Sequence, residues 1–191
     1  MHRKFQKIGD RLRLLKEDID VYVSYADTPD RYRSRSHFRN FLTLFFGRNC
    51  FRYIFYFRLG NHARVLRFFF PTPYDSTTIE CPHSELEGGG LFLSHAFGTI
   101  LNVDHIGKGC CFCQNTTFGN LYKDGRWQRP YVGRNVMVGA NVVVLGGVHV
   151  GDNVRIGAGS VVTKDIPDNC TVVGNPARII RKDGIKVDIL L

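Results

Sequence analysis

The chain has 191 residues, of which 43% are hydrophobic, and a formal net charge of +9 from 26 basic and 17 acidic residues. This length favours one extended domain with an appendage over two equal domains. No apolar region typical of a signal peptide stands at the N-terminus, and the six cysteines match neither a disulfide framework nor a zinc site. We therefore expect a cytoplasmic protein without a metal.

The first predicted element is an amphipathic helix over residues 4–24. Apolar residues recur in it at helical spacing, with charged residues between them: Ile8, Leu12, Leu15 and Ile19. Residues 26–30, which include Pro29, end this helix.

Residues 31–74 form a basic and aromatic segment that contains nine arginines and no Asp or Glu. No part of it is uncharged for the about 20 residues that a membrane span needs. Three interpretations are open: helices packed on the β domain or on another subunit, an interfacial segment on an anionic membrane, or a nucleic-acid site. We expect packing, keep contact with the inner membrane surface open, and predict no nucleic-acid partner. Pro71 and Pro73 end this helical segment, which spans residues 1–75.

A six-residue repeat dominates residues 132–167. Each hexad begins with Val or Ile, and Gly often follows: VGRNVM, VGANVV, VLGGVH, VGDNVR, IGAGSV, VTKDIP. A helix would show a 3.6-residue period and an ordinary strand would alternate by two. The hexad predicts one short strand and one tight turn, three of which close a triangular coil of about eighteen residues. The predicted fold class is therefore mainly β, a parallel β-helix.

The repeat is irregular before residue 132. Its register slips by one residue near 99–105, and a long loop over residues 119–131 interrupts it. Loops inserted into repeats commonly carry function. We place the β-helix domain at residues 76–181 and expect the tail, residues 182–191, to cap the last coil.

Three motifs are more specific than the hexads: Ser94-His95-Ala96-Phe97-Gly98, the run from Gly157 to Lys164, and Gly174-Asn175-Pro176-Ala177-Arg178. With the long loop, they make residues 79–181 resemble the left-handed β-helix acetyltransferases of the hexapeptide-repeat superfamily. The nearest resemblance is to serine acetyltransferases and to the polysaccharide O-acetyltransferases of the colanic-acid type. It implies acetyl-CoA as co-substrate and a homotrimer, alone or as a dimer of trimers.

The resemblance also implies catalytic residues. Acetyl transfer to a hydroxyl needs a base with a pKa near neutrality, and His95 stands where the family has its catalytic histidine. The family orients this histidine with an acid fifteen residues earlier, which is Glu80 here. A backbone N–H near Gly119 is the candidate for holding the oxyanion.

The resemblance also implies which residues bind acetyl-CoA. The resemblance places small residues along the pantetheine arm and basic or polar residues near the nucleotide phosphates. Those matching the arm are Gly119, Ala140 and Ala158, and those matching the nucleotide end are Thr163, Lys164, Arg178 and Arg181.

The acceptor is where this sequence departs from the serine acetyltransferases. They have Asp before the catalytic His and Arg-His-Pro at the end of the loop, whereas this chain has Ser94 and Gln128-Arg129-Pro130. The aromatic, polar loop with Trp127 and Tyr122 suits a carbohydrate ring. We therefore predict acetylation of a sugar hydroxyl in a surface polysaccharide precursor, with Ser94, Trp127 and Arg129 at the acceptor. The alternatives are a serine O-acetyltransferase and a non-catalytic binding module at a membrane.

Overall fold

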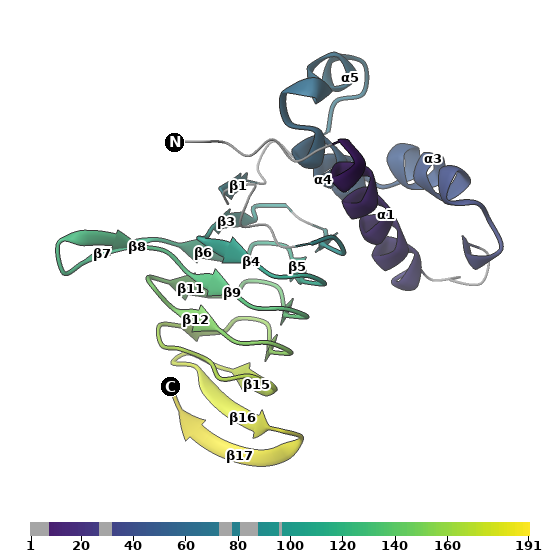
Figure 1. Ribbon diagram of the computed structural model, residues 1–191. Coiled ribbons are helices and arrows are strands. Elements are labelled where there is room, and N and C mark those ends of the chain that lie inside the picture. The colour runs from purple at the N-terminus through teal and green to yellow at the C-terminus, as the bar shows by residue number, and fades with distance from the viewer. Residues whose placement is uncertain (1–7, 27–31, 73–77, 81–87, 96) are drawn as a thin grey trace. The chain divides into compact units, whose positions relative to one another are not determined.

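A computed structural model describes residues 8–26, 32–72, 78–80, 88–95 and 97–191. The chain divides into two compact units. The helical unit comprises the described residues up to 72 together with 88–92, and the β-helix unit comprises 78–80 and the described residues from 93 onward. Figure 1 labels the helices of the first unit and the strands of the second.

The helical unit contains four α-helices and one short 3-10 helix in its described part. They are α1 (Ile8–Ser24), α3 (His37–Gly47), α4 (Asn49–Leu59), η1 (Gly60–Ala63) and α5 (Arg64–Phe69). Ser36 is the N-cap of α3, and its hydroxyl accepts a hydrogen bond from the backbone N–H of Arg39 at 3.4 Å. None of the described helices is long and apolar enough to cross a membrane.

The predicted apolar face of α1 is partly wrong. Leu12 is 62% exposed, whereas the buried face is made by Leu14, Ile19, Tyr22 and Val23. The centre of that face is Asp18, which is fully buried. Ile19 lies on the predicted side, but the charged residue at a buried position breaks the apolar period, so the period alone selects Leu12 in place of Leu14. The side chain of Ile8 lies outside the described residues.

Asp18 joins three segments of the helical unit. It forms a two-point ion pair with Arg58 of α4, with Nε to Oδ2 at 3.0 Å and Nη2 to Oδ1 at 3.1 Å. The backbone N–H groups of Gly90 and Leu91 donate to the same carboxylate at 2.8 and 3.0 Å. Burial raises the pKa of Asp18, while Arg58 and the two N–H donors oppose the rise.

The aromatic residues of the helical unit divide into two sets. Phe45, Phe51, Phe55 and Tyr56 are buried and meet one another or their neighbours mostly edge to face. Several other rings on α3 and α5 are exposed. Only the first set forms the core of this unit.

In the β-helix unit three sheets, parallel except at β16 and β17, wrap around one core (Figure 1). The five-stranded sheet contains β1 (Thr78–Glu80), β3 (Ile100–Asn102), β6 (Thr117–Gly119), β11 (Val143–Leu145) and β14 (Val161–Val162). The three-stranded sheet contains β4 (His105–Ile106), β9 (Tyr131–Val132) and β12 (His149–Val150). The seven-stranded sheet contains β2 (Phe92–Ser94), β5 (Cys111–Cys113), β10 (Met137–Val138), β13 (Arg155–Ile156), β15 (Cys170–Val173), β16 (Arg178–Lys182) and β17 (Ile185–Leu190).

The strand registers confirm the predicted coil. Tyr131 lies opposite His149, Met137 opposite Arg155, and Val143 opposite Val161, so each pair is eighteen residues apart. The first residue of each hexad points inward, and Val132, Val138, Val144, Val150, Ile156 and Val162 are all at most 2% exposed.

The predicted interruptions are also present. Ile100 lies opposite Thr117, an offset of seventeen, so this coil is one residue shorter than a regular one. The buried residues Leu93 and Ile106 are thirteen positions apart, one more than two hexads, which is the predicted slip. His105 lies opposite Tyr131, an offset of twenty-six, so eight residues are inserted into that coil. The inserted residues form an antiparallel hairpin of β7 (Leu121–Lys123) and β8 (Arg126–Gln128), which projects from the unit (Figure 1).

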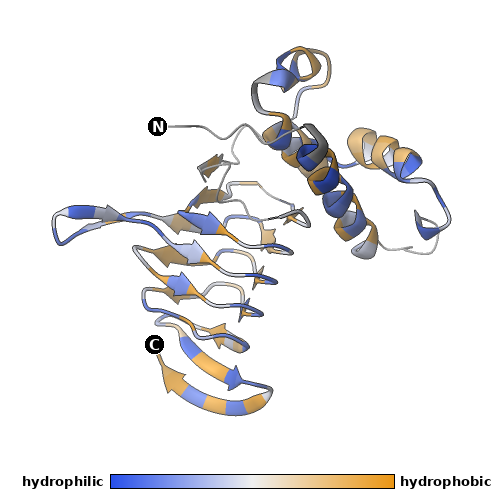
Figure 2. Cartoon of the chain, in the orientation of Figure 1, coloured by the Kyte–Doolittle hydropathy of each residue, from blue (hydrophilic) through white to orange (hydrophobic). Residues whose placement is uncertain are grey.

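The C-terminal end differs from the predicted cap. β16 pairs antiparallel with β15, and β17 pairs antiparallel with β16, so the tail extends the seven-stranded sheet. Hydrophilic and hydrophobic residues alternate along these two strands in Figure 2. The open edge is therefore moved from the last coil to β17, where Lys186 and Asp188 supply charge.

Candidate active site

His95 directly follows β2 and has a φ of +52°, a left-handed conformation that is uncommon for residues other than glycine. Its side chain is exposed. The inward residues on either side of it, Leu93 and Leu101, are eight positions apart, whereas Phe112 and Phe118 in the next coil are six apart. The corner that carries His95 is therefore two residues longer than a regular corner.

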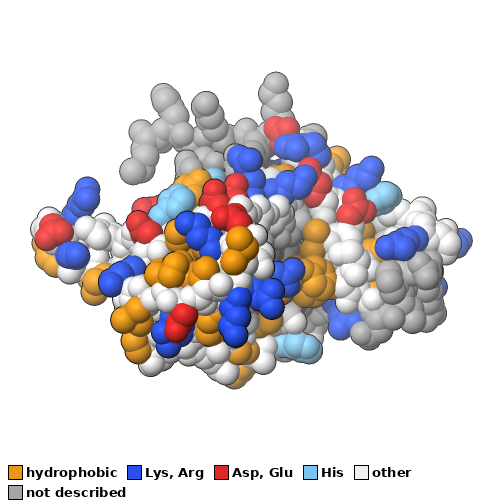
Figure 3. All heavy atoms as spheres, turned by 90° about the horizontal axis from the view of Figure 1, so that it is seen from below, with side chains coloured by type: hydrophobic (Ala, Val, Ile, Leu, Met, Phe, Trp, Pro, Cys, Tyr) orange, Lys and Arg blue, Asp and Glu red, His pale blue; other side chains and the backbone are white. Residues whose placement is uncertain are grey.

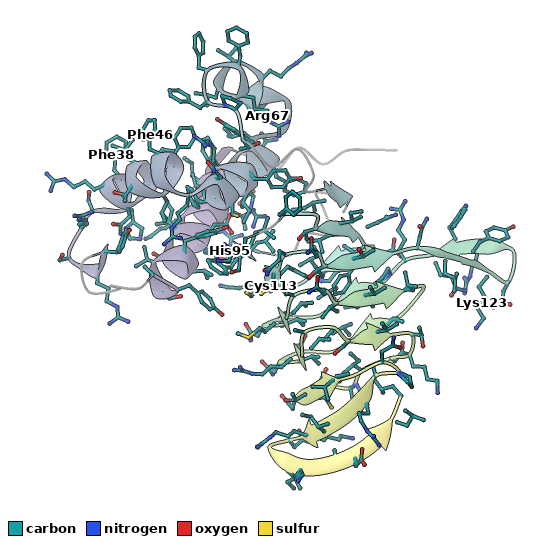
Figure 4. The ribbon with its side chains drawn as sticks, turned by 180° about the vertical axis from the view of Figure 1, so that it is seen from behind. Phe38, Phe46, Arg67, His95, Cys113 and Lys123 are labelled. Carbon is teal, nitrogen blue, oxygen red and sulfur yellow. The ribbon has the colours of Figure 1, made fainter. Side chains whose placement is uncertain are left out.

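Two residues of neighbouring strands stand next to the His95 corner: Ser94 at the end of β2 and Cys113 at the end of β5. The Ser94 hydroxyl is hydrogen-bonded to the thiol of Cys113. This thiol is also hydrogen-bonded to the thiol of Cys111 on the same strand. Burial raises the pKa of Cys113, although both hydrogen bonds act to lower it. Figure 4 shows His95 and Cys113 on the same side of the unit, away from the hairpin residue Lys123. Cys113 is a residue of this corner that the sequence did not predict, and it lies on β5, the strand beside β2.

The buried thiols are poor candidates for chemistry. Burial raises the pKa of Cys110 and of Cys111 to about 12, so both are protonated near neutral pH. Among the described residues, no group of three or more His, Cys, Asp or Glu side chains could hold a metal ion.

Glu80 is the predicted partner of His95. Its backbone lies on β1 opposite Asn102, at the end of β3 that is farther from the His95 corner. The side chain of Glu80 lies outside the described residues. The pairing of Glu80 with His95 therefore stays a prediction.

The corner of His95 is the top of a column of stacked corners, which we call the His95 column. Backbone hydrogen bonds join successive corners: Asn115 N–H to Phe97 O at 2.8 Å, Asn141 N–H to Gln114 O at 3.1 Å, and Gly159 N–H to Ala140 O at 2.9 Å. Ala140 and Ala158 thus lie two and three coils from His95. Three coils correspond to about 14 Å, since neighbouring strands are spaced by about 4.8 Å.

Gly119, Thr163 and Lys164 belong to a different column. They stand at the opposite end of the five-stranded sheet, where β6 and β14 end. A strand of three residues, about 10 Å long, separates the two columns. Gly119 therefore stands at a different corner from His95, and the role of its N–H at the oxyanion stays a prediction.

The residues predicted for acetyl-CoA fit a thin ligand with an anionic end. Ala140 is half-buried and Ala158 is exposed, and a Cβ at the neighbouring Gly139 would come within 2.6 Å of the Ala158 backbone nitrogen. Backbone therefore approaches closely along the His95 column. Gly174 continues this column through its N–H bond to Ser160 Oγ, at 3.2 Å.

Basic residues gather at the C-terminal end of the β-helix. Thr163, Lys164, Arg178 and Arg181 are all exposed. Arg178 lies opposite Val173, next to the foot of the His95 column, and is ion-paired with Asp188. Figure 3, which views the molecule from below, shows several Lys and Arg side chains on this end beside exposed apolar ones. Phosphate groups would meet positive charge here.

The predicted acceptor residues are divided between the two columns. Ser94 lies on the His95 column, while Trp127 is on the hairpin and Arg129 follows it. Trp127 is 65% exposed, and its ring meets that of Tyr122 at 5.3 Å. One chain does not bring Trp127 or Arg129 to His95.

Comparisons with known proteins identify the family. The family model "Bacterial transferase hexapeptide (six repeats)" matches residues 129–164. A serine acetyltransferase of Synechococcus elongatus is 44% identical over 104 residues, which are 54% of this chain and 43% of that protein. A serine acetyltransferase of Bacillus subtilis is 31% identical over 185 residues, which are 92% of this chain and 80% of that protein. The chain belongs to the serine acetyltransferase family of hexapeptide-repeat transferases.

A solved serine acetyltransferase supports the same placement. The structure from Brucella abortus in complex with coenzyme A superposes with a TM-score of 0.67 at 26% identity, covering 94% of this chain and 71% of that one. The predicted left-handed β-helix with a helical N-terminal segment is thereby confirmed. The chain nevertheless spans only about half the length of the first curated serine acetyltransferases it matches, 43% and 56%.

Proposed function

We propose that this protein is an acetyl-CoA-dependent O-acetyltransferase and that its acceptor is the hydroxyl of serine. The observation that carries the proposal is the 31% identity with a serine acetyltransferase over 92% of the chain. In the structure, His95 occupies an enlarged, exposed corner. The comparisons support serine, the alternative in our sequence analysis, and give no support to the polysaccharide subtype that ranked first.

Bound acetyl-CoA supplies an acetyl thioester. His95 removes the proton from the acceptor hydroxyl, so that the oxygen can attack the acetyl carbon, and then returns this proton to the departing sulfur. Glu80 orients the imidazole and stabilises its protonated form. Ala140 and Ala158 leave room for the pantetheine arm, while Thr163, Lys164, Arg178 and Arg181 bind the nucleotide end.

We further propose that the working form is a homotrimer, alone or as a dimer of trimers. Ser94 and His95 stand on one column, and Gly119, Trp127 and Arg129 stand on or near the other. Closed threefold packing presents one column of each copy to a different column of its neighbour. A second copy would thus complete the acceptor site and the acetyl-CoA groove.

The test of the catalytic assignment is the His95→Ala variant. Loss of the general base should lower kcat by about 10²–10⁴-fold while the variant stays folded. The rate is measured as release of free CoA with L-serine as acceptor. His149→Ala is the matched control, because His149 is also exposed but lies on the three-stranded sheet. Undiminished turnover in His95→Ala would sink the assignment.

A sugar hydroxyl is the second candidate acceptor. The observation in its favour is Ser94, whose hydroxyl is bonded to Cys113 and offers no carboxylate to a substrate ammonium group. A panel of sugars assayed beside L-serine separates the two acceptors. If serine is the acceptor, Ser94→Asp should lower its KM. If no acceptor is turned over although acetyl-CoA binds, the protein is a binding module instead.

A cytoplasmic location is part of the same proposal. Four cysteines among the described residues are free thiols: Cys110, Cys111, Cys113 and Cys170. Free cysteines are typical of a reducing compartment, where acetyl-CoA is also made.

A further inference from the structure

An exposed apolar stripe runs along α3. Phe38, Leu42 and Phe46 follow one another at intervals of four residues, so they share one face of the helix. They are 68%, 37% and 59% exposed. Figure 2 colours most of α3 as hydrophobic, and Figure 4 shows Phe38 and Phe46 directed outward from it. Leu44, on the opposite face of α3, packs into the core.

A second exposed apolar face lies on α5. Val65, Phe68 and Phe69, spaced by three and four residues, are 69%, 82% and 67% exposed. The two faces are continuous, because Phe46 of α3 meets Phe70 at the end of α5 with ring centroids 5.5 Å apart. We call the combined area the aromatic surface; it consists of Phe38, Leu42, Phe46, Val65, Phe68, Phe69 and Phe70.

The α5 helix is held firmly enough to present these rings. The Tyr56 hydroxyl donates to the backbone oxygen of Phe70 at 2.8 Å, and the Arg67 guanidinium lies 5.4 Å from the centre of the Tyr56 ring. Tyr56 itself is 1% exposed and belongs to the core. The exposed phenylalanines are therefore anchored to the folded unit through the other side of α5.

The charge around the aromatic surface has one sign. No Asp or Glu occurs between residues 31 and 74, and at the start of α3 His37 Nε2 lies 3.0 Å from Asp20 Oδ1 of α1. Five arginines of this segment are exposed in the described structure: Arg33, Arg39, Arg48, Arg64 and Arg67. Exposed rings among arginines are typical of segments that lie at the boundary of an anionic membrane.

We propose that the aromatic surface docks on an anionic lipid bilayer. A second copy of the same surface fits less well, because symmetric pairing would bring arginine against arginine with no acid of the segment to compensate. Lipid phosphates supply the missing negative charge, and the acyl region accepts the phenyl rings. The proposal does not depend on acetyl transfer.

Vesicle flotation of the full chain tests the proposal. Binding is compared on phosphatidylcholine vesicles and on vesicles that also contain phosphatidylglycerol. We expect binding to the second kind only, weakened by salt. The Phe68→Ser/Phe69→Ser variant should bind at least about tenfold more weakly, since each ring loses its apolar contact. The matched control is Ile185→Ser/Leu190→Ser on β17, where both residues are exposed to similar extents, 69% and 63%, and which should bind like the unaltered chain.

Three outcomes would overturn the proposal. One is equal binding to both kinds of vesicle or to neither. Another is unchanged binding by the Phe68→Ser/Phe69→Ser variant. The third is absent vesicle binding together with another effect of the Phe68→Ser/Phe69→Ser variant. A changed oligomeric state in light scattering would make the surface an interface between copies. A changed retention of RNA would make it a nucleic-acid site.

Discussion

In the β-helix unit the strands of the regular coils each contribute an inward apolar side chain to a common core, whereas in the helical unit three segments converge on the single carboxylate of Asp18. The first arrangement spreads stability over many similar contacts. The second adds to an aromatic core one buried ion pair, and removal of Asp18 leaves Arg58 buried without a counter-charge. The two units are therefore stabilised in different ways, and we expect single substitutions to destabilise them differently.

Replacing Asp18 with Ala should have the largest effect on stability. Loss of one partner of a buried ion pair costs about 3–5 kcal/mol, and here two backbone N–H donors also lose their acceptor. Hydrogen exchange should show rapid exchange in α1 and α4 while the strands from β9 to β15 remain protected. Asp20→Ala on the same helix is the control, because its ion pair with His37 is exposed and worth under about 1 kcal/mol. Equal effects of the two substitutions would show that Asp18 is not the centre of this unit.

The β-helix core should instead respond to pH. The pKa of the Cys110 thiol is raised by burial to about 12 from an ordinary value of 9.0, so the folded state keeps the proton that the unfolded state loses above pH 9. The free energy of unfolding should therefore fall as the pH rises from 9 towards 12, by about 1.4 kcal/mol per pH unit for this thiol. Urea titrations under reducing conditions at pH 8 and 10 measure the change. Cys110→Ala should remove this part of the slope.

A core substitution without a titrating group is the control for that experiment. Val136 is 1% exposed, and Val136→Ala should lower stability at both pH values while keeping the slope of the unaltered chain. If Cys110→Ala kept that slope too, the thiol would not be the cause of the alkaline loss.

The smallest predicted effect concerns a ladder of amide side chains at one corner. Asn135 Nδ2 donates to Asn153 Oδ1 at 3.1 Å, and Asn153 Nδ2 donates to Asn169 Oδ1 at 3.0 Å. Asn153 has a φ of +57°, which glycine also tolerates. Asn153→Gly should cost about 1 kcal/mol for the lost bonds. Asn153→Val should cost about 1–2 kcal/mol more, because a β-branched residue is strained at this φ. Equal losses in thermal denaturation would mean that the backbone conformation is not what selects asparagine.

The repeated part of this chain could be predicted from sequence almost residue by residue. The period of six identified the inward positions from Val132 to Val162, the one-residue slip, and the interruption after Gly119. This works because every coil satisfies the same local rule, so one residue type at one position carries the same meaning each time.

The helical unit and the site were predicted less completely, for two physical reasons. A buried carboxylate such as Asp18 has no signature in an apolar pattern, since its partner Arg58 is forty residues away. The separation of Gly119 from His95 depends on which corner each occupies, and the irregular coils before residue 132 obscure that count. The bond between Ser94 and Cys113 likewise joins neighbouring coils rather than neighbours in sequence.

The stacked corners of the His95 column are regularly spaced. Each coil adds a fixed step of about 4.8 Å between His95 and any group farther down the same column. Ala140 and Ala158 differ by one such step and by eighteen residues. Gaining or losing a whole coil would thus change the reach of this surface by one step without altering any corner. The length of linear ligand that suits a fold of this kind is consequently a property of residue number, independent of side-chain identity.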